Sequence, residues 1–181
     1  MTLDNASGSR VDKLALLREE RVRLGQAADH LQWSLARCVP LVALATWNAE
    51  ALERLESLAS RFARLADLLT QRVMRLADEL ELESPGTLLD RVRRAEKRGW
   101  VQQDGQLVRV RELRNLINHE YEDEDLAALY REVITLVPVL LQAAQAATPG
   151  PAPFADRPAR TGSLNRPAEA RPSAGLARPR S

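Results

Sequence analysis

One short segment of the chain gathers side chains that can do acid–base chemistry. Residues 114–121 are Arg-Asn-Leu-Ile-Asn-His-Glu-Tyr, and His119 is one of only two histidines in the protein. An imidazole titrates near neutral pH and can take up a proton there. A guanidinium such as that of Arg114 offers a fork of donors to a phosphate or a carboxylate. The segment therefore holds groups suited to general-base catalysis and to the stabilisation of negative charge.

Helical spacing divides these side chains into two sets. On an ideal helix Asn115 and His119 are four residues apart and lie on one face, so the amide can orient the imidazole. Arg114 lies about 140° around the helix from His119 and does not share that face. A common site needs the long Arg114 side chain to reach round, or a second copy of the helix from another protomer. From the residues alone, an apolar helix that ends in a polar cap is the favoured interpretation.

Other polar and aromatic residues have plainer interpretations. We expect His30 on a helix surface, and the three tryptophans (Trp33, Trp47 and Trp100) in the core or at an interface. A basic patch is expected to be a solvated face, with the lining of an RNA groove or contact with an acidic partner as the alternative; it comprises Arg91, Arg93, Arg94, Lys97 and Arg98. The acidic residues within 120–125 suit the N-terminal end of a following helix, where the helix dipole favours acids.

Composition predicts an all-α protein that is reduced and cytoplasmic. Aromatic residues make up 4% of the chain against 45% apolar residues, so the core must be mostly Leu, Ala and Val, of which Leu and Ala favour helices. Cys38 is the only cysteine, which excludes an intramolecular disulfide and a multi-cysteine zinc site. Residues 1–10 lack the apolar core of a signal peptide, and no apolar stretch approaches the roughly 18 residues of a membrane span. His119 has no second neutral ligand nearby, so we expect neither a metal nor another cofactor.

The first half of the chain predicts two long helices after a flexible N-terminus, 1–10. The first helix begins at Val11 and ends near Val39, because Pro40 cannot sit in a helix interior. The second, over 48–82, has the strongest heptad pattern of the sequence and would span roughly 50 Å. Its apolar stripe comprises Leu52, Leu55, Ala59, Phe62, Ala66, Leu69, Val73, Leu76 and Leu80, with a second stripe at Leu58, Leu65 and Leu68. This face exceeds what one bundle of this size should bury, so we expect a homodimer or a higher oligomer.

The second half predicts shorter helices and a tail. Ser84 is the expected N-cap of a short helix with Pro85 at its first position, and Gly99 fits its C-terminal cap. Two further helices follow on either side of the acidic run, which completes a helical domain over 11–147. Residues 148–181 hold seven of the ten prolines and six arginines against two acids. We expect this basic, Pro-rich tail to be disordered.

The segment at 114–121 and the helices before it resemble a known family. The pattern Arg-Asn-x-x-x-His-x-Tyr is similar to the signature of the HEPN superfamily. Within it, the resemblance is to the toxin-like HepT proteins that pair with a minimal nucleotidyltransferase. Three upstream segments, 60–69, 87–91 and 95–99, are also similar to that group. The resemblance covers roughly 11–145.

The resemblance implies an antiparallel helical bundle that dimerises and a metal-independent endoribonuclease that acts on RNA. His119 would be the general base on a ribose 2′-hydroxyl, Arg114 would stabilise the charged transition state, and Asn115 would support them. Tyr121 matches a tyrosine to which a nucleotidyltransferase antitoxin adds AMP, which silences the toxin. The alternative is a relative without catalysis, the nucleotide-binding or scaffold subunit of a minimal nucleotidyltransferase.

We predict that co-expression with the cognate nucleotidyltransferase adds the mass of one or more AMP groups to the intact chain. The added phosphate lies near Arg114 and competes with RNA for its guanidinium. Tyr121→Phe should abolish the mass shift in intact-mass spectrometry. A shift that persists in Tyr121→Phe, or that never appears with an active partner, places the switch elsewhere.

Overall fold

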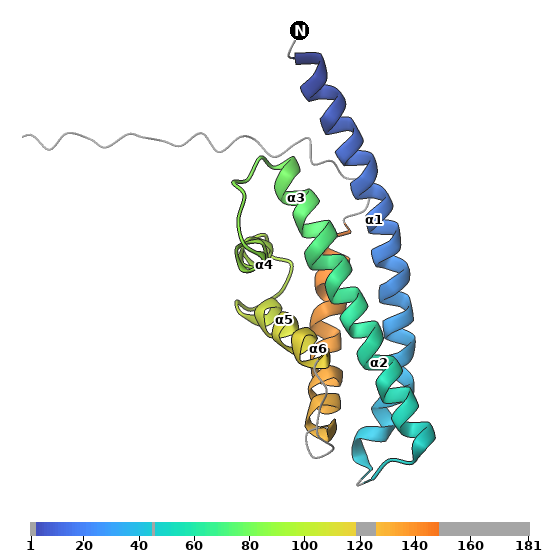
Figure 1. The fold of residues 1–181 in the computed structure, drawn as a ribbon. Helices are drawn as coiled ribbons and strands as arrows, with labels where there is room; N and C mark the ends of the chain where they lie inside the picture. Colours follow the sequence, from blue (N-terminus) through green and yellow to red (C-terminus); the bar gives the residue numbers. More distant parts are fainter. Residues whose placement is uncertain (1–2, 45, 119–125, 149–181) are drawn as a thin grey trace, which may run out of the picture. The chain divides into compact units, whose positions relative to one another are not determined.

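The computed structural model describes residues 3–44, 46–118 and 126–148, and the regular secondary structure within them is all helical. The prediction of an all-α protein is therefore confirmed. The elements in chain order are α1 (Leu3–Cys38), a 3-10 helix (Val39–Ala43), α2 (Ala49–Asp67), a π-helical segment (Leu68–Val73), α3 (Met74–Leu80), α4 (Leu88–Lys97), α5 (Gln106–Ile117) and α6 (Leu126–Ala146) (Figure 1). Residues 149–181, almost all of the predicted tail, lie outside the described residues.

Helix α1 begins earlier than the sequence predicts. Its first residue is Leu3, so the expected start of the helix at Val11 is wrong. Each residue added to an existing helix gains one backbone hydrogen bond, and no new helix nucleus has to form. This gain offsets the weak helix propensities of Gly8 and its neighbours. The first turns of α1 project past the end of α3 (Figure 1). The C-terminal end agrees with the prediction, because α1 ends at Cys38 and Pro40 lies in the first turn of the 3-10 helix.

The long helix predicted over 48–82 is present, with one irregularity. Asn48 is its N-cap, and its Oδ1 accepts a hydrogen bond from the Ala51 amide at 2.9 Å. Helices α2 and α3 run on through the π-helical segment, which begins directly after Asp67. The heptad pattern does not predict this segment, and π-helical turns inside α-helices are frequent at functional sites.

The apolar stripe of this long helix is buried within a single chain. Most of the predicted stripe is less than a tenth exposed, and Leu52 and Leu68 are half-buried. It packs against α1, which runs antiparallel beside it (Figure 1), and α2 also packs against α5 and α6. The stripe therefore gives no reason to expect a second protomer, and the homodimer or higher oligomer stays a prediction. Helix α1 is longer than predicted, and it packs along α2, the π-helical segment and α3, which carry the stripe.

The start of α4 differs from the prediction, and its end agrees. Thr87, not Ser84, is the N-cap: its Oγ1 accepts from the Asp90 amide at 3.2 Å, and Asp90 accepts from the Thr87 amide at 2.8 Å. This reciprocal pair is a capping box. At the other end Gly99 takes a φ of 79°, which glycine adopts without strain. The amides of Gly99 and Trp100 bond back to Glu96 and Ala95, which closes the helix.

Part of the basic patch on α4 is bound to acids of α3. Arg94 Nε donates to Asp78 Oδ2 at 2.9 Å, and Arg98 Nη2 lies 2.7 Å from Asp78 Oδ1 and 2.8 Å from Glu81 Oε2. Asp78 is only 6% exposed, so these pairs attach α4 to α3 in a partly dry environment. The prediction of a solvated face holds for Arg93 and Lys97 but is wrong for the two paired arginines.

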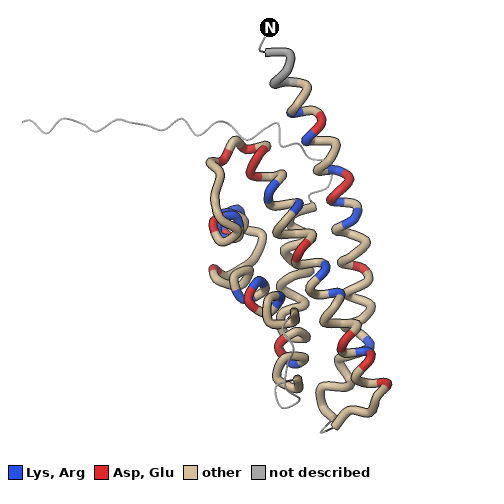
Figure 2. Tube along the Cα trace, in the orientation of Figure 1, with Lys and Arg blue, Asp and Glu red and all other residues tan. Residues whose placement is uncertain are grey.

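Helix α6 is the most apolar helix of the described chain. By length and composition alone it is able to cross a membrane, since its 21 residues are long and apolar enough. The expectation that no stretch is long enough is wrong for this helix. A core helix has the same composition, and α6 packs against α1, α2 and α5. Figure 2 shows how few charged residues it carries compared with α1. Its buried side chains are Tyr130, Val133, Leu136, Val137, Leu140, Ala143 and Ala144.

We predict that Thr87→Ala lowers the free energy of unfolding by about 1 kcal/mol, because it removes the side-chain acceptor at the start of α4. Ser84→Ala is the matched control, since Ser84 is exposed and outside the helix; its effect should stay within about 0.5 kcal/mol. Urea unfolding followed by circular dichroism measures both. A larger loss in Ser84→Ala than in Thr87→Ala would contradict the assigned cap.

Candidate functional site

The predicted arginine is held by an aspartate from a distant part of the chain. Arg114, in the last turn of α5, donates from Nε to Asp67 Oδ1 and from Nη2 to Asp67 Oδ2, both at 2.7 Å. This fork-to-fork geometry fixes the plane of the guanidinium. The hydrogen bond to Asp67 raises the pKa of Arg114 above its ordinary value. The side chains remain 30% and 40% exposed, so the pair lies at the surface between α2 and α5.

Two features of the fold position this pair. Helix α5 is anchored by three buried side chains on one face, Leu107, Val110 and Leu113. Its N-terminal end receives the carboxylate of Glu96, whose Oε1 accepts from the Leu107 amide at 2.9 Å. A buried acid at this end of a helix satisfies a free amide and is favoured by the helix dipole. On the other side, Asp67 is the last residue of α2 before the π-helical segment.

The structure tests only part of the predicted site. Asn115 is exposed on α5, and its side chain makes no hydrogen bond with another described residue. His119 and Tyr121 lie outside the described residues. Asp67 was not predicted as a site residue, because it lies 47 positions from Arg114 and no spacing in the sequence links the two. One signal of Asp67 in the sequence was a charged residue at the margin of a strongly apolar stripe.

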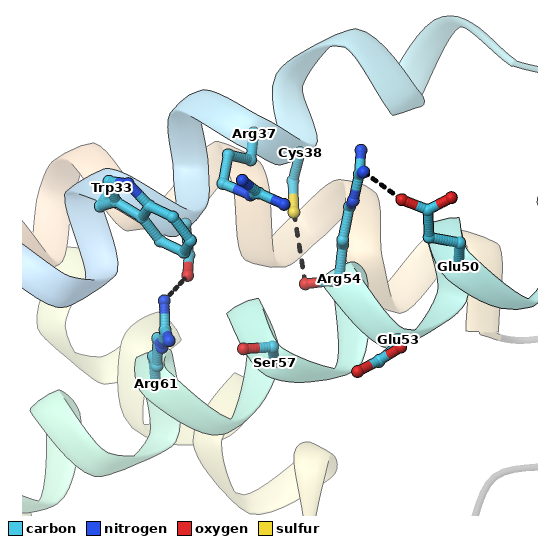
Figure 3. A pocket seen from close by; sticks show the side chains of 9 residues that line it. Trp33, Arg37, Cys38, Glu50, Glu53, Arg54, Ser57 and Arg61 are labelled. Carbon is cyan, nitrogen blue, oxygen red and sulfur yellow. Dashed lines mark hydrogen bonds and ion pairs between the residues drawn. The ribbon is translucent and has the colours of Figure 1, made fainter.

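A second candidate site is a surface pocket between α1 and α2. It has a volume of about 280 Å³, and Figure 3 shows most of its lining side chains. Helix α1 contributes Trp33, Ser34, Arg37 and Cys38, and α2 contributes Glu50, Glu53, Arg54, Ser57 and Arg61. None of these residues belongs to the predicted site. Three of the nine are arginines, so the pocket has an excess of positive charge over its two carboxylates.

Trp33 and two arginines form the cationic end of this pocket. The guanidinium carbons of Arg37 and Arg61 lie 4.6 Å and 5.3 Å from the centre of the Trp33 ring. At exposed sites such cation–π contacts are worth only about 0.5–1 kcal/mol. Trp33 is 56% exposed, so it does not pack in the core of the chain, and the interface that the sequence offered as the other place for it stays a prediction. The other two tryptophans do pack inward, with Trp100 7% exposed and Trp47 half-buried against Tyr130.

Cys38 closes the floor of the pocket. Its thiol is 1% exposed and donates to the Arg54 carbonyl at 3.3 Å (Figure 3). Burial raises the pKa of Cys38, and the charges of Arg54, Arg37 and Arg61 act in the opposite direction. The positive charges of three guanidinium groups therefore lower the pKa of the Cys38 thiol, but desolvation raises it by more.

The described residues define a class of protein, an all-α helical bundle with a surface arginine–aspartate pair and a separate arginine-rich pocket. Among the described residues, no group of His, Cys, Asp and Glu side chains is arranged to hold a metal ion. Comparison with known proteins adds no relative: no family model matches the chain, and neither a curated protein nor a solved structure matches it significantly.

We predict that Cys38 reacts with a disulfide reagent at pH 8 at least about tenfold more slowly in the folded chain than in urea. Burial blocks access, and a raised pKa leaves a smaller fraction of reactive thiolate at that pH. The control is Cys38→Ser combined with Ser60→Cys, which puts the single thiol on the exposed face of α2. Fast labelling of the native chain, equal to that of this control, would show that the thiol is not buried.

Proposed function

We propose that the chain is a HEPN-type toxin, a metal-independent endoribonuclease with Arg114 and His119 as its catalytic residues. Asn115 supports them, and a cognate minimal nucleotidyltransferase antitoxin neutralises the toxin by adding AMP to Tyr121. The proposal rests on the sequence of 114–121 and on one observation in the structure, the fixed orientation of the Arg114 guanidinium.

The Arg114–Asp67 pair supports a role in binding phosphate. Asp67 engages one edge of the guanidinium, through Nε and Nη2. Nη1, on the other edge, has no partner among the described residues, and the side chain is 30% exposed. A guanidinium that is already oriented loses little freedom when it binds a second oxyanion. Asp67 acts here as a positioning residue for Arg114.

The end of α5 is compatible with a site shared by Arg114 and His119. The helix ends at Ile117, with Asn118 as its C-cap. The helical rule that separates Arg114 from His119 by about 140° requires an unbroken helix and therefore applies only as far as this end. Within the proposal, His119 approaches the guanidinium from beyond the helix or from a second protomer.

The proposed reaction is a transesterification within RNA. His119 takes the proton of a ribose 2′-hydroxyl, and the 2′-oxygen forms a bond to the adjacent phosphorus. The bond from phosphorus to the 5′-oxygen breaks, and that oxygen takes up a proton as it leaves. Arg114 stabilises the negative charge that builds on the phosphoryl oxygens during this exchange. In this scheme neither bond formation nor bond cleavage requires a metal or another cofactor.

The same ion pair also supports the second candidate, a subunit that binds a nucleotidyltransferase without cleaving RNA. The charge of Asp67 neutralises that of Arg114, and the two hydrogen bonds between them hold α2 and α5 together. The acidic residues within 120–125 add negative charge that repels RNA. The long apolar stripe of α2 and α3 no longer supports this candidate, since the chain itself buries it.

We predict that expression of the chain alone arrests bacterial growth and that the purified protein cleaves RNA in the presence of a chelator. His119→Ala should reduce the rate of cleavage by at least about 100-fold and relieve the arrest, because the general base is lost. His30→Ala is the matched control, since His30 is the other histidine and is exposed on α1. Equal activity of His119→Ala and the parent chain would exclude His119 as the base.

Asp67→Asn tests the positioning role and separates the two candidates. A neutral amide cannot pair with both nitrogens as a carboxylate does, so kcat for RNA should fall about tenfold while the pH profile set by His119 stays unchanged. A chain that leaves RNA intact on long incubation, yet co-purifies with a neighbouring nucleotidyltransferase, would instead support the binding subunit.

A further inference from the structure

The pocket between α1 and α2 has a polarity that a simple packing defect would lack. Seven of its nine lining residues are polar or charged, and three are arginines. Arg54 is paired with Glu50 at one end of the pocket. At the other end, neither Arg37 nor Arg61 is paired with a carboxylate of the described residues. The unmatched positive charge therefore lies next to Trp33.

We propose that this pocket binds a nucleotide, free or as one unit of a single strand, with its phosphate between Arg37 and Arg61 and its base on Trp33. The volume of about 280 Å³ is close to the lower end of the range of small-molecule sites, roughly 300 to 1,000 Å³, and suits one nucleotide. The proposal is independent of RNA cleavage, because none of these residues belongs to the ribonuclease site.

Arg61 is already oriented for an anion. Its Nη1 donates to the Ser34 hydroxyl and to the His30 carbonyl, the latter at 3.3 Å. Both acceptors are neutral, so they fix the guanidinium without cancelling its charge. Its remaining donors have no partner among the described residues. A fixed, uncompensated guanidinium is a strong site for a phosphate.

Arg37 and Trp33 provide the adaptable part of the site. Arg37 is exposed, and its described contact is the cation–π contact with the Trp33 ring. Such a contact is weak at an exposed position, so a phosphate can draw the Arg37 guanidinium away from the ring, while Arg61 stays beside it. An exposed indole beside guanidinium groups is a platform on which bases of any sequence stack.

A protein partner fits this pocket less well. Protein interfaces bury aromatic or aliphatic anchors in apolar pockets, whereas only Trp33 and Cys38 are apolar among the lining residues. Unpaired guanidinium groups covered by protein would lose hydration without compensation. A phosphate supplies the missing charge, and Glu53 limits its affinity because an exposed carboxylate in the same pocket opposes an anion.

The test measures binding of AMP and of a short fluorescein-labelled oligodeoxythymidine to the full chain, by calorimetry and by anisotropy. The deoxy strand has no 2′-hydroxyl and cannot be cleaved by the proposed ribonuclease chemistry, so the result is independent of that activity. Arg37→Gln, Arg61→Gln and Trp33→Ala should each weaken binding about tenfold. Glu53→Gln should strengthen it a few-fold, since it removes an opposing charge.

Arg18→Gln is the matched control, because Arg18 is an exposed arginine of α1 outside the pocket; it should leave binding unchanged. Thermal unfolding of every variant shows that the fold persists, and Arg37 and Trp33 are exposed enough to be replaced safely. Binding of AMP identifies a site for a free nucleotide, and binding of the strand alone identifies a site for single-stranded nucleic acid. The proposal is overturned if neither probe binds, or if Arg18→Gln weakens binding as much as Arg37→Gln does.

Discussion

The burial of the apolar face of the helix from Ala49 to Leu80 determines where the other helices lie. Side chains such as Leu55, Phe62 and Leu69 are completely buried, and each contributes about 2 kcal/mol by leaving water. A face this wide cannot be covered by one neighbour, so α1 lies along one side and α5 and α6 along the other. Both candidate sites are at the margins of this contact, one between α2 and α5 and one between α1 and α2.

Acidic residues at the margins of the same contact bind arginines from other elements. Asp67 holds Arg114 of α5, and Asp78 of α3 holds Arg94 of α4 and Arg98, its C-cap. Glu20 of α1, only 2% exposed, lies 3.2 Å from Arg72 of the π-helical segment. Asp78 and Glu20 are buried, and removing their arginines would leave an uncompensated charge, so these pairs favour one arrangement of the helices over alternatives. Apolar burial attaches the helices, and these pairs add polar links between neighbouring elements.

The two sites differ in how their arginines are used. Arg114 is matched by a carboxylate and keeps one edge free, which suits a group that must be oriented before it meets a phosphate. Arg61 is held by neutral acceptors and keeps its full charge, which suits binding rather than catalysis. The π-helical segment begins directly after Asp67, so the irregular part of the long helix adjoins the first of these sites.

The sequence alone determined the helical class, the long helix beginning at Asn48 and the end of α1 before Pro40, because these follow from periodicity and from the properties of single residues. It also singled out Arg114.

Tertiary structure alone decided which acid meets that arginine, since Asp67 is remote in the chain and becomes adjacent only when α5 packs on α2. It likewise decided that the long stripe is covered within one chain and that Trp33 stays exposed beside two arginines. Helical periodicity states which side chains share a face, but the neighbour that covers each face depends on how all the helices pack together.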